Sequence, residues 1–301
     1  MRCANNSERR LAAVLLLPAL AALAVFQYVP MYGLTIAYRE FSWRAPFAGP
    51  SVGMEHFARL LQDPVFGQAV ANTVCYALSA AALLGVGAVF VAGVFHLGAA
   101  PDRTLSFSTL VIAPSFLSWV VVSLLVTRLL AFRGPVNQLI IATNLSTTGL
   151  PFLTTSGLFG AVFVLTAVWK QTGILAFLIW TLLQHGDSSV RDAAAIDGLS
   201  RIGTFVLIEL GVLKWQIAAL VLLFVLMLFD SFGEQALSIG NAAVRASADV
   251  IESYGYRIGV QQGRWPLAVA ASLIAALVRA VFAGVLLMVI SGARSTEGGS
   301  A

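Results

Sequence analysis

The stretch Gly157–Gln184 reads GLFGAVFVLTAVWKQTGILAFLIWTLLQ, and Lys170 is its one charged residue. A hydrocarbon core of about 30 Å requires about 20 helical residues to cross it. The stretch is long and apolar enough, so it predicts a transmembrane helix. The whole chain shares this character, because 59% of its residues are hydrophobic and 11% are charged. Soluble proteins carry about 25% charged residues, so the composition predicts a membrane protein.

Five further stretches pass the same length test, and together they predict an all-α membrane protein with six spans. These stretches are Leu11–Tyr38, Gln68–Leu97, Leu105–Ala131, Trp215–Phe232 and Trp265–Ser291. We expect the first span to bend at Pro18 or Pro30. Trp215 and Trp265 open the last two spans, where an aromatic ring suits the headgroup layer.

The basic residues say little about how the chain is oriented in the membrane. Arg9 and Arg10 precede the first span as in a signal peptide, with a possible cleavage site at Ala22–Ala24. Because the apolar character continues to Tyr32, we predict a retained anchor. Lys and Arg divide almost evenly between the two sides, and only the pair next to the first span favours a cytoplasmic N-terminus. The net charge of +4 comes from scattered residues, which excludes nucleic acid as a partner.

The segment between the fourth and fifth spans predicts a short helix outside the membrane. Ser189-Val190-Arg191-Asp192 has the spacing of a capping box, so the helix is expected to begin at Ser189. Three alanines at 193–195 continue the helix with minimal side chains. Gly198 can adopt the left-handed conformation that ends it.

A second, amphipathic helix is expected after this glycine, from apolar residues three or so apart: Leu199, Ile202, Phe205 and Ile208. A short helix with small side chains allows the close approach of another protein. The alternative is an ordinary surface loop, in which the alanines express helix propensity only.

The same segment resembles the Glu-Ala-Ala loop in the permease subunits of ATP-binding-cassette (ABC) importers. Its Asp192-Ala193-Ala194 is followed after three residues by Gly198, and after nine more by Ile208-x-Leu210. The chain departs from that pattern with Asp192 in place of Glu and Gly211 in place of Pro. The resemblance implies a cytoplasmic loop that docks on an ATPase subunit through Asp192, Ala193, Ala194, Asp197 and Gly198.

Other stretches resemble the carbohydrate-importer branch, in particular permeases for aldouronate, polygalacturonate and alginate fragments. They are Tyr28–Gly33, Val52–Phe57, Asn72-Thr73, Phe116–Val121, Trp169-Lys170 and Ala248–Arg257. The resemblance implies a six-helix type I ABC importer transmembrane domain over residues 11–294 with a cytoplasmic coupling helix in loop 185–214. The protein would lie in a bacterial inner membrane. Its cytoplasmic ends would be an N-terminus of residues 1–10 and a tail of residues 295–301.

The implied partners are a second homologous permease, two ATP-binding-cassette ATPases, an extracytoplasmic solute-binding protein, the lipid bilayer and an oligosaccharide. The outer segments 41–66 and 233–264 would meet the binding protein. The chain lacks a P-loop, since its two lysines, Lys170 and Lys214, follow Trp169 and Leu213. We therefore expect no cofactor on this chain, with ATP and Mg held by the ATPase, and no metal site or enzymatic activity.

Charged side chains at membrane depth mark candidate substrate contacts. We select Lys170, Asp230 and Arg279, together with Trp169, which can cover a sugar ring while Lys170 meets its carboxylate. Weaker candidates are Trp119, Asn72, Glu234 and Gln235. The alternative is structural pairing, for instance of Asp230 with one of the cations. A self-contained secondary transporter or channel would instead use these charges for ion coupling, and a membrane-embedded enzyme would need a clustered active site that the sequence lacks.

Overall fold

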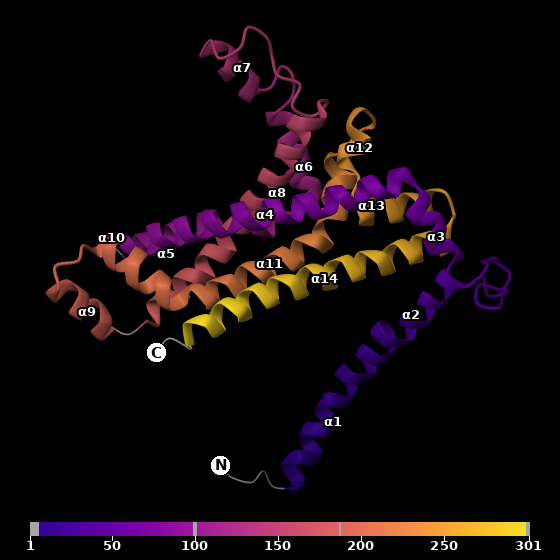
Figure 1. Cartoon of the computed structure of the whole chain (residues 1–301), viewed down its shortest axis with the longest axis horizontal. Coiled ribbons are helices and arrows are strands. Elements are labelled where there is room, and N and C mark those ends of the chain that lie inside the picture. Colours follow the sequence, from indigo (N-terminus) through magenta and orange to yellow (C-terminus); the bar gives the residue numbers. More distant parts are fainter. Residues whose placement is uncertain (1–5, 99–100, 187, 299–301) are drawn as a thin grey trace. The chain divides into compact units, whose positions relative to one another are not determined.

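The computed structural model describes residues 6–98, 101–186 and 188–298 and is helical almost throughout (Figure 1). Within that described part, the β structure is limited to one bridge between Arg39 and Ser51. The chain divides into two compact units, one formed by residues 1–63 and 255–274 and the other by residues 64–254 and 275–301. The prediction of an all-α chain is therefore confirmed.

The first unit holds the N-terminal span and a surface segment. Short 3-10 or π-helical pieces are labelled η, and the elements are α1 (Asn6–Leu23), η1 (Ala24–Tyr28), α2 (Val29–Met31), η2 (Tyr32–Tyr38) and α3 (Glu55–Gln62). A π-helical turn precedes Pro30, which has no N–H to donate to a regular helix. Within the outer segment 41–66, α3 buries Phe57 and Leu60.

The second unit contains most of the apolar helices. Its elements are α4 (Pro64–Leu97), α5 (Pro101–Ile112), η3 (Ala113–Phe116), α6 (Trp119–Leu129), α7 (Pro135–Ala142), α8 (Ser156–Gln184), α9 (Ser188–Ile196), α10 (Arg201–Thr204), η4 (Phe205–Glu209), α11 (Leu210–Ile239), η5 (Ala242–Val244) and α12 (Arg245–Ala248). Three later elements cross between the units or lie in the first: α13 (Ile251–Tyr256), η6 (Arg257–Gln261) and α14 (Trp265–Gly298).

Within the described residues, five helices are long and apolar enough to cross a membrane, and a bent pair of helices makes a possible sixth. The predicted spans at Gln68–Leu97 and Gly157–Gln184 match α4 and α8 within a few residues. The count of six is reached only when the bent pair is taken as one span.

The predicted third span, Leu105–Ala131, corresponds to this bent pair of helices. The chain turns by 103° between residues 107–116 and 119–129. Pro114 is the second residue of the 3-10 turn η3, and the hydroxyl of Ser118 accepts a hydrogen bond from the Val121 amide at the start of α6. The two arms together pass a hydropathy test for one span, so hydropathy alone does not reveal the break.

The fifth span is also longer than predicted. The structure has one candidate span over Arg201–Ile239, so the expected amphipathic helix and the span Trp215–Phe232 form one continuous helix. Gly211 interrupts nothing, since glycine weakens a helix by only about 1 kcal/mol whereas proline costs about 3. The continuous helix connects the segment after Gly198 directly to the membrane core.

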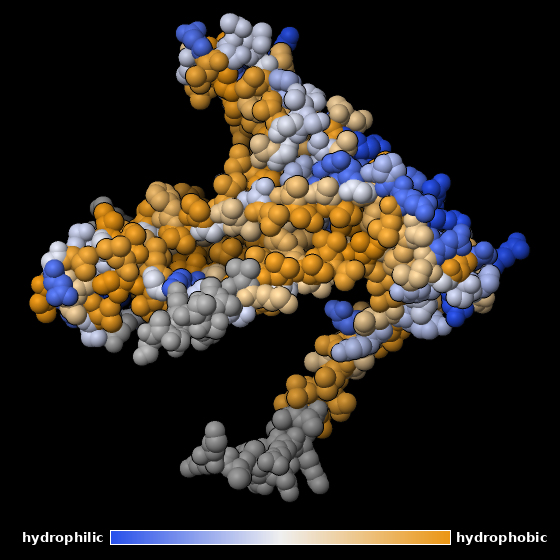
Figure 2. Space-filling view, viewed as in Figure 1, coloured by the Kyte–Doolittle hydropathy of each residue, from blue (hydrophilic) through white to orange (hydrophobic). Residues whose placement is uncertain are grey.

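The core of the second unit is built by α8, which packs against α4, α5 and α11. Aromatic rings fill its centre, with Tyr76 stacked on Phe163 at 4.8 Å and Phe163 against Phe232 at 5.6 Å. The outer surface of α4 and α11 is largely hydrophobic, as Figure 2 shows. In this unit α9 and α10 lie at one end of the bundle and α12 at the opposite end (Figure 1).

Candidate functional site

The predicted coupling residues lie on and just after α9. Asp192, Ala193, Asp197 and Gly198 are exposed, whereas Ala194 faces inward and is 2% exposed. Ile196, the last residue of the helix, is 87% exposed. Ala193 and Ile196 therefore give α9 an exposed apolar surface.

The end of α9 has the geometry that the sequence predicts. Gly198 adopts φ +80°, which is the left-handed conformation. The Leu199 amide donates to the Ala194 carbonyl at 3.0 Å and the Gly198 amide to the Ala195 carbonyl at 3.2 Å. These two bonds form a Schellman motif, which fixes the direction of the chain after the helix. The helix α9 begins at Ser188, one residue before the predicted start at Ser189.

Lys170 lies near the centre of α8 and is 8% exposed. Its ammonium donates to the Ser115 carbonyl at 3.0 Å and lies 5.4 Å from the centre of the Trp119 ring. The Ser115 hydroxyl in turn donates to the Lys170 carbonyl at 2.6 Å. Lys170 therefore ties the bent span to α8.

Trp169 lies on another side of α8 and is 44% exposed, because consecutive helical residues project about 100° apart. The structure thus places Trp119, not Trp169, beside the Lys170 ammonium. Glu234 is exposed on α11. Substrate contact by Lys170, Trp119, Trp169 and Glu234 stays a prediction.

Asn72 and Gln235 have internal partners. The Asn72 amide donates to the carbonyls of Ala246 at 2.7 Å and Asp249 at 2.9 Å, which holds the α12 region to α4. Gln235 is fully buried and donates to the Phe163 carbonyl at 2.7 Å. Both side chains connect helices in this structure, and their role as substrate contacts also stays a prediction.

The structure brings together Asp230 and Arg279, two of the predicted membrane charges. The Arg279 guanidinium donates to Asp230 at 2.5 Å, lies 3.6 Å from the Glu252 carboxylate, and sits over the Phe229 ring. This is the structural pairing that the sequence left open as an alternative. Burial raises the pKa of the Glu252 carboxyl above its ordinary value, and a backbone hydrogen bond and Arg279 oppose that rise.

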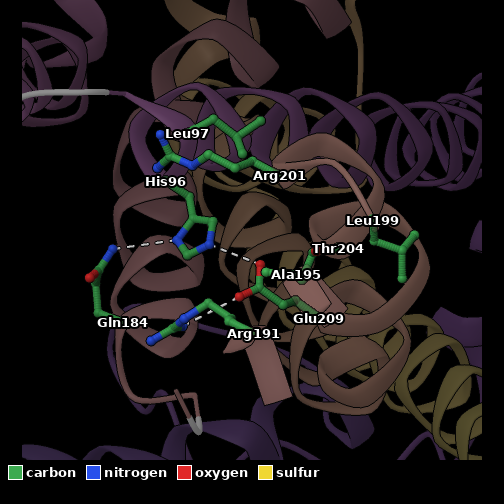
Figure 3. Close-up of a pocket in the computed structure, with 9 residues that line it drawn as sticks. All are labelled: His96, Leu97, Gln184, Arg191, Ala195, Leu199, Arg201, Thr204 and Glu209. Carbon is green, nitrogen blue, oxygen red and sulfur yellow. Dashed lines mark hydrogen bonds and ion pairs between the residues drawn. The ribbon is translucent and has the colours of Figure 1, made fainter. Parts of the chain in front are cut away.

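A polar cluster beside α9 was missed by the sequence analysis. His96 at the end of α4, Arg191 on α9 and Glu209 on η4 point toward one another in Figure 3. They border a cavity of about 320 Å³. The three residues are far apart in the sequence and form no motif, so no local signal could have found them. Among the described residues, no group of His, Cys, Asp and Glu could hold a metal ion.

No protein-family profile matches the chain. The polygalacturonan/rhamnogalacturonan transport system permease protein YteP of Bacillus subtilis (strain 168) is 28% identical over 271 residues, which cover 88% of this chain and 83% of that protein. The protein LplB of the same organism is 26% identical over the same shares. A chain of a bacterial ABC transporter involved in the import of the acidic polysaccharide alginate superposes with a TM-score of 0.83 at 24% identity, covering 93% of this chain and 95% of the other.

Proposed function

We propose that this chain, a homologue of carbohydrate ABC transporter permeases with the fold of an ABC importer permease, translocates acidic oligosaccharides across the bacterial inner membrane. The substrate class would be aldouronate, alginate or pectin fragments. The named substrates of YteP and of the alginate transporter support this class, because both are acidic polysaccharides. The similarity to these permeases favours this function over that of a self-contained secondary transporter or channel.

The complete transporter would contain a second, homologous permease, two ATPase subunits that bind ATP and Mg, and an extracytoplasmic solute-binding protein. A related alginate transporter has been solved with an alginate pentasaccharide-bound periplasmic protein, and its chain superposes with a TM-score of 0.81. Both termini and the loop 185–214 would be cytoplasmic, and residues 11–294 would form the transmembrane domain. ATP binding would close the ATPases and shift the bundle between inward-open and outward-open states.

The observation that carries the proposal is the form of α9. The helix presents Ala193 and the 87% exposed Ile196 outward, and a left-handed glycine sets its exit angle. It lies at the end of the second unit opposite α12 (Figure 1). An exposed short helix at one end of the bundle, joined by the Gly198 turn to a helix of membrane-spanning length, can transmit movement of an ATPase to the transmembrane bundle.

A cross-linking experiment tests this docking. With Cys3 and Cys75 replaced by serine, Ile196→Cys is expected to cross-link to the ATPase subunit in membranes, and ATP is expected to change the yield. Ala243→Cys is the matched control, since it is also exposed but lies in η5 at the opposite end of the same unit. Reaction at Ala243→Cys and none at Ile196→Cys would refute the proposed docking.

Lys170→Met tests the substrate class. An ammonium beside an aromatic ring can bind a sugar carboxylate, whereas a neutral sugar has no charge to meet it. We expect uptake of an acidic oligosaccharide to fall about tenfold more than uptake of its neutral counterpart, which corresponds to about 1.4 kcal/mol for a charge-assisted bond. The measurement is paired uptake of both sugars in proteoliposomes. Equal losses would assign Lys170 to holding the bent span alone.

A further inference from the structure

We propose that Glu209 is the positioning residue that links α9 to the membrane helices and lets movement of α9 reach α4. The proposal rests on the proposed function, since it concerns how the docking helix is attached. Glu209 is the unspecified middle residue of the Ile208-x-Leu210 pattern, so the family resemblance assigns it no role.

The carboxylate of Glu209 uses its two oxygens for two different elements. Oε2 lies 2.8 Å from Nε2 of His96 in the last turn of α4, and Oε1 lies 3.4 Å from Nη1 of Arg191 on α9. The residue itself ends η4 and leads directly into α11. One side chain thus joins the docking helix, the end of α4 and the start of α11 (Figure 3).

The partners of Glu209 extend the link to α8. Arg191 also reaches the Leu183 carbonyl at 3.5 Å, and the Gln184 amide lies 3.4 Å from Nδ1 of His96. An imidazole can accept from Gln184 at Nδ1 and donate to Glu209 at Nε2, so one tautomer of His96 is compatible with both contacts.

Because Glu209 is largely buried, its carboxylate depends on these contacts. Its side chain is 10% exposed, and a desolvated carboxylate is stable only with partners that satisfy its oxygens. The cavity of about 320 Å³ next to the cluster leaves room between α9, α10 and the ends of α4 and α8. The contacts of Glu209 with His96 and Arg191 lie beside this unfilled space. They therefore help to hold α9 in position.

Glu209→Gln in the complete transporter tests the link. The amide keeps the acceptor for His96, but it has no charge to attract Arg191, so the polar link between Glu209 and α9 is weakened. We expect the amount of sugar imported per ATP hydrolysed to fall about fivefold or more, which is the low end of typical coupling between sites. The ATPase rate itself is expected to persist. Glu297→Gln makes the same chemical change near the chain end and is expected to leave the ratio unchanged.

A reversible rescue separates a link from general structural damage. In the background without Cys3 and Cys75, the pair Arg191→Cys and Glu209→Cys is expected to be uncoupled. A short bifunctional thiol-disulfide reagent should restore coupling by joining the two side chains, and a reductant should remove it again. A merely structural role would not respond to the reductant.

Hydrogen exchange gives a second measurement that does not depend on transport. Amide exchange in α9 is expected to accelerate in Glu209→Gln and in Arg191→Gln, while exchange in the centre of α8 stays unchanged. If Glu209→Gln imports as much sugar per ATP as the wild type and amide exchange in α9 is unchanged, the role of Glu209 is overturned and the proposed function stays intact. Absence of ATP-dependent import by the wild-type transporter would overturn both.

Discussion

Gly198→Val is expected to abolish most sugar uptake while the chain still inserts in the membrane and the ATPases still hydrolyse ATP. Gly198 has φ +80°, and a β-branched residue is a genuine outlier in that conformation. The left-handed conformation costs an L-residue about 1–2 kcal/mol, which corresponds to about a five- to thirtyfold change in population. The substitution therefore shifts the exit of α9 away from the geometry that docking requires. Uptake and ATP hydrolysis in proteoliposomes measure both parts of this expectation.

Two control variants isolate the backbone effect. A Cβ atom at Gly198 meets nothing within 4 Å, so the expected loss does not come from a clash inside the chain. Gly198→Asn should keep most of the uptake, because asparagine tolerates the left-handed region. Gly67→Val adds the same side chain at another open glycine, which is helical in α4, and should have little effect. Normal uptake by Gly198→Val would contradict the role of the turn.

Gly173→Ala is expected to disrupt the packing of the bent span and to lower the thermal stability of the purified chain. An alanine Cβ at this position would lie 2.0 Å from the Val111 carbonyl oxygen and 2.6 Å from its carbon. Both are backbone atoms, so the clash is relieved only when α5 moves away from α8. Overpacking of this kind costs about 1–3 kcal/mol or more. A thermal unfolding series in detergent measures the loss.

Gly87→Ala is the matched control for this prediction. Its added Cβ would lie 3.6 Å from Thr172 on α8, which is an ordinary contact, so its transition should match the wild type. The clash at Gly173 lies about one helical turn from the bonds between Lys170 and Ser115. We therefore expect the acidic-sugar preference to weaken in Gly173→Ala as well. An unchanged unfolding transition would show that α5 can move away from α8 without loss of stability.

Properties that depend on neighbouring residues could be read from the chain itself. Hydropathy located α4 and α8 closely, because a helix in lipid must be apolar along its whole length. Gly198 was recognised as a helix end because only a glycine adopts the left-handed conformation without strain. The bend near Pro114 and the continuity across Gly211 were not predicted, since proline and glycine permit either outcome and packing selects one.

The pairing of side chains across helices was decided by the tertiary structure. Composition marked Lys170, Asp230 and Arg279 as costly charges, but their partners depend on the rotation of each helix about its axis, and that rotation leaves no local signal. For the same reason Trp119, not the adjacent Trp169, meets Lys170. The cluster of His96, Arg191 and Glu209 exists only because the ends of four helices converge there. Local chemistry therefore determined the membrane class and the end of α9, and helix packing determined which charges meet.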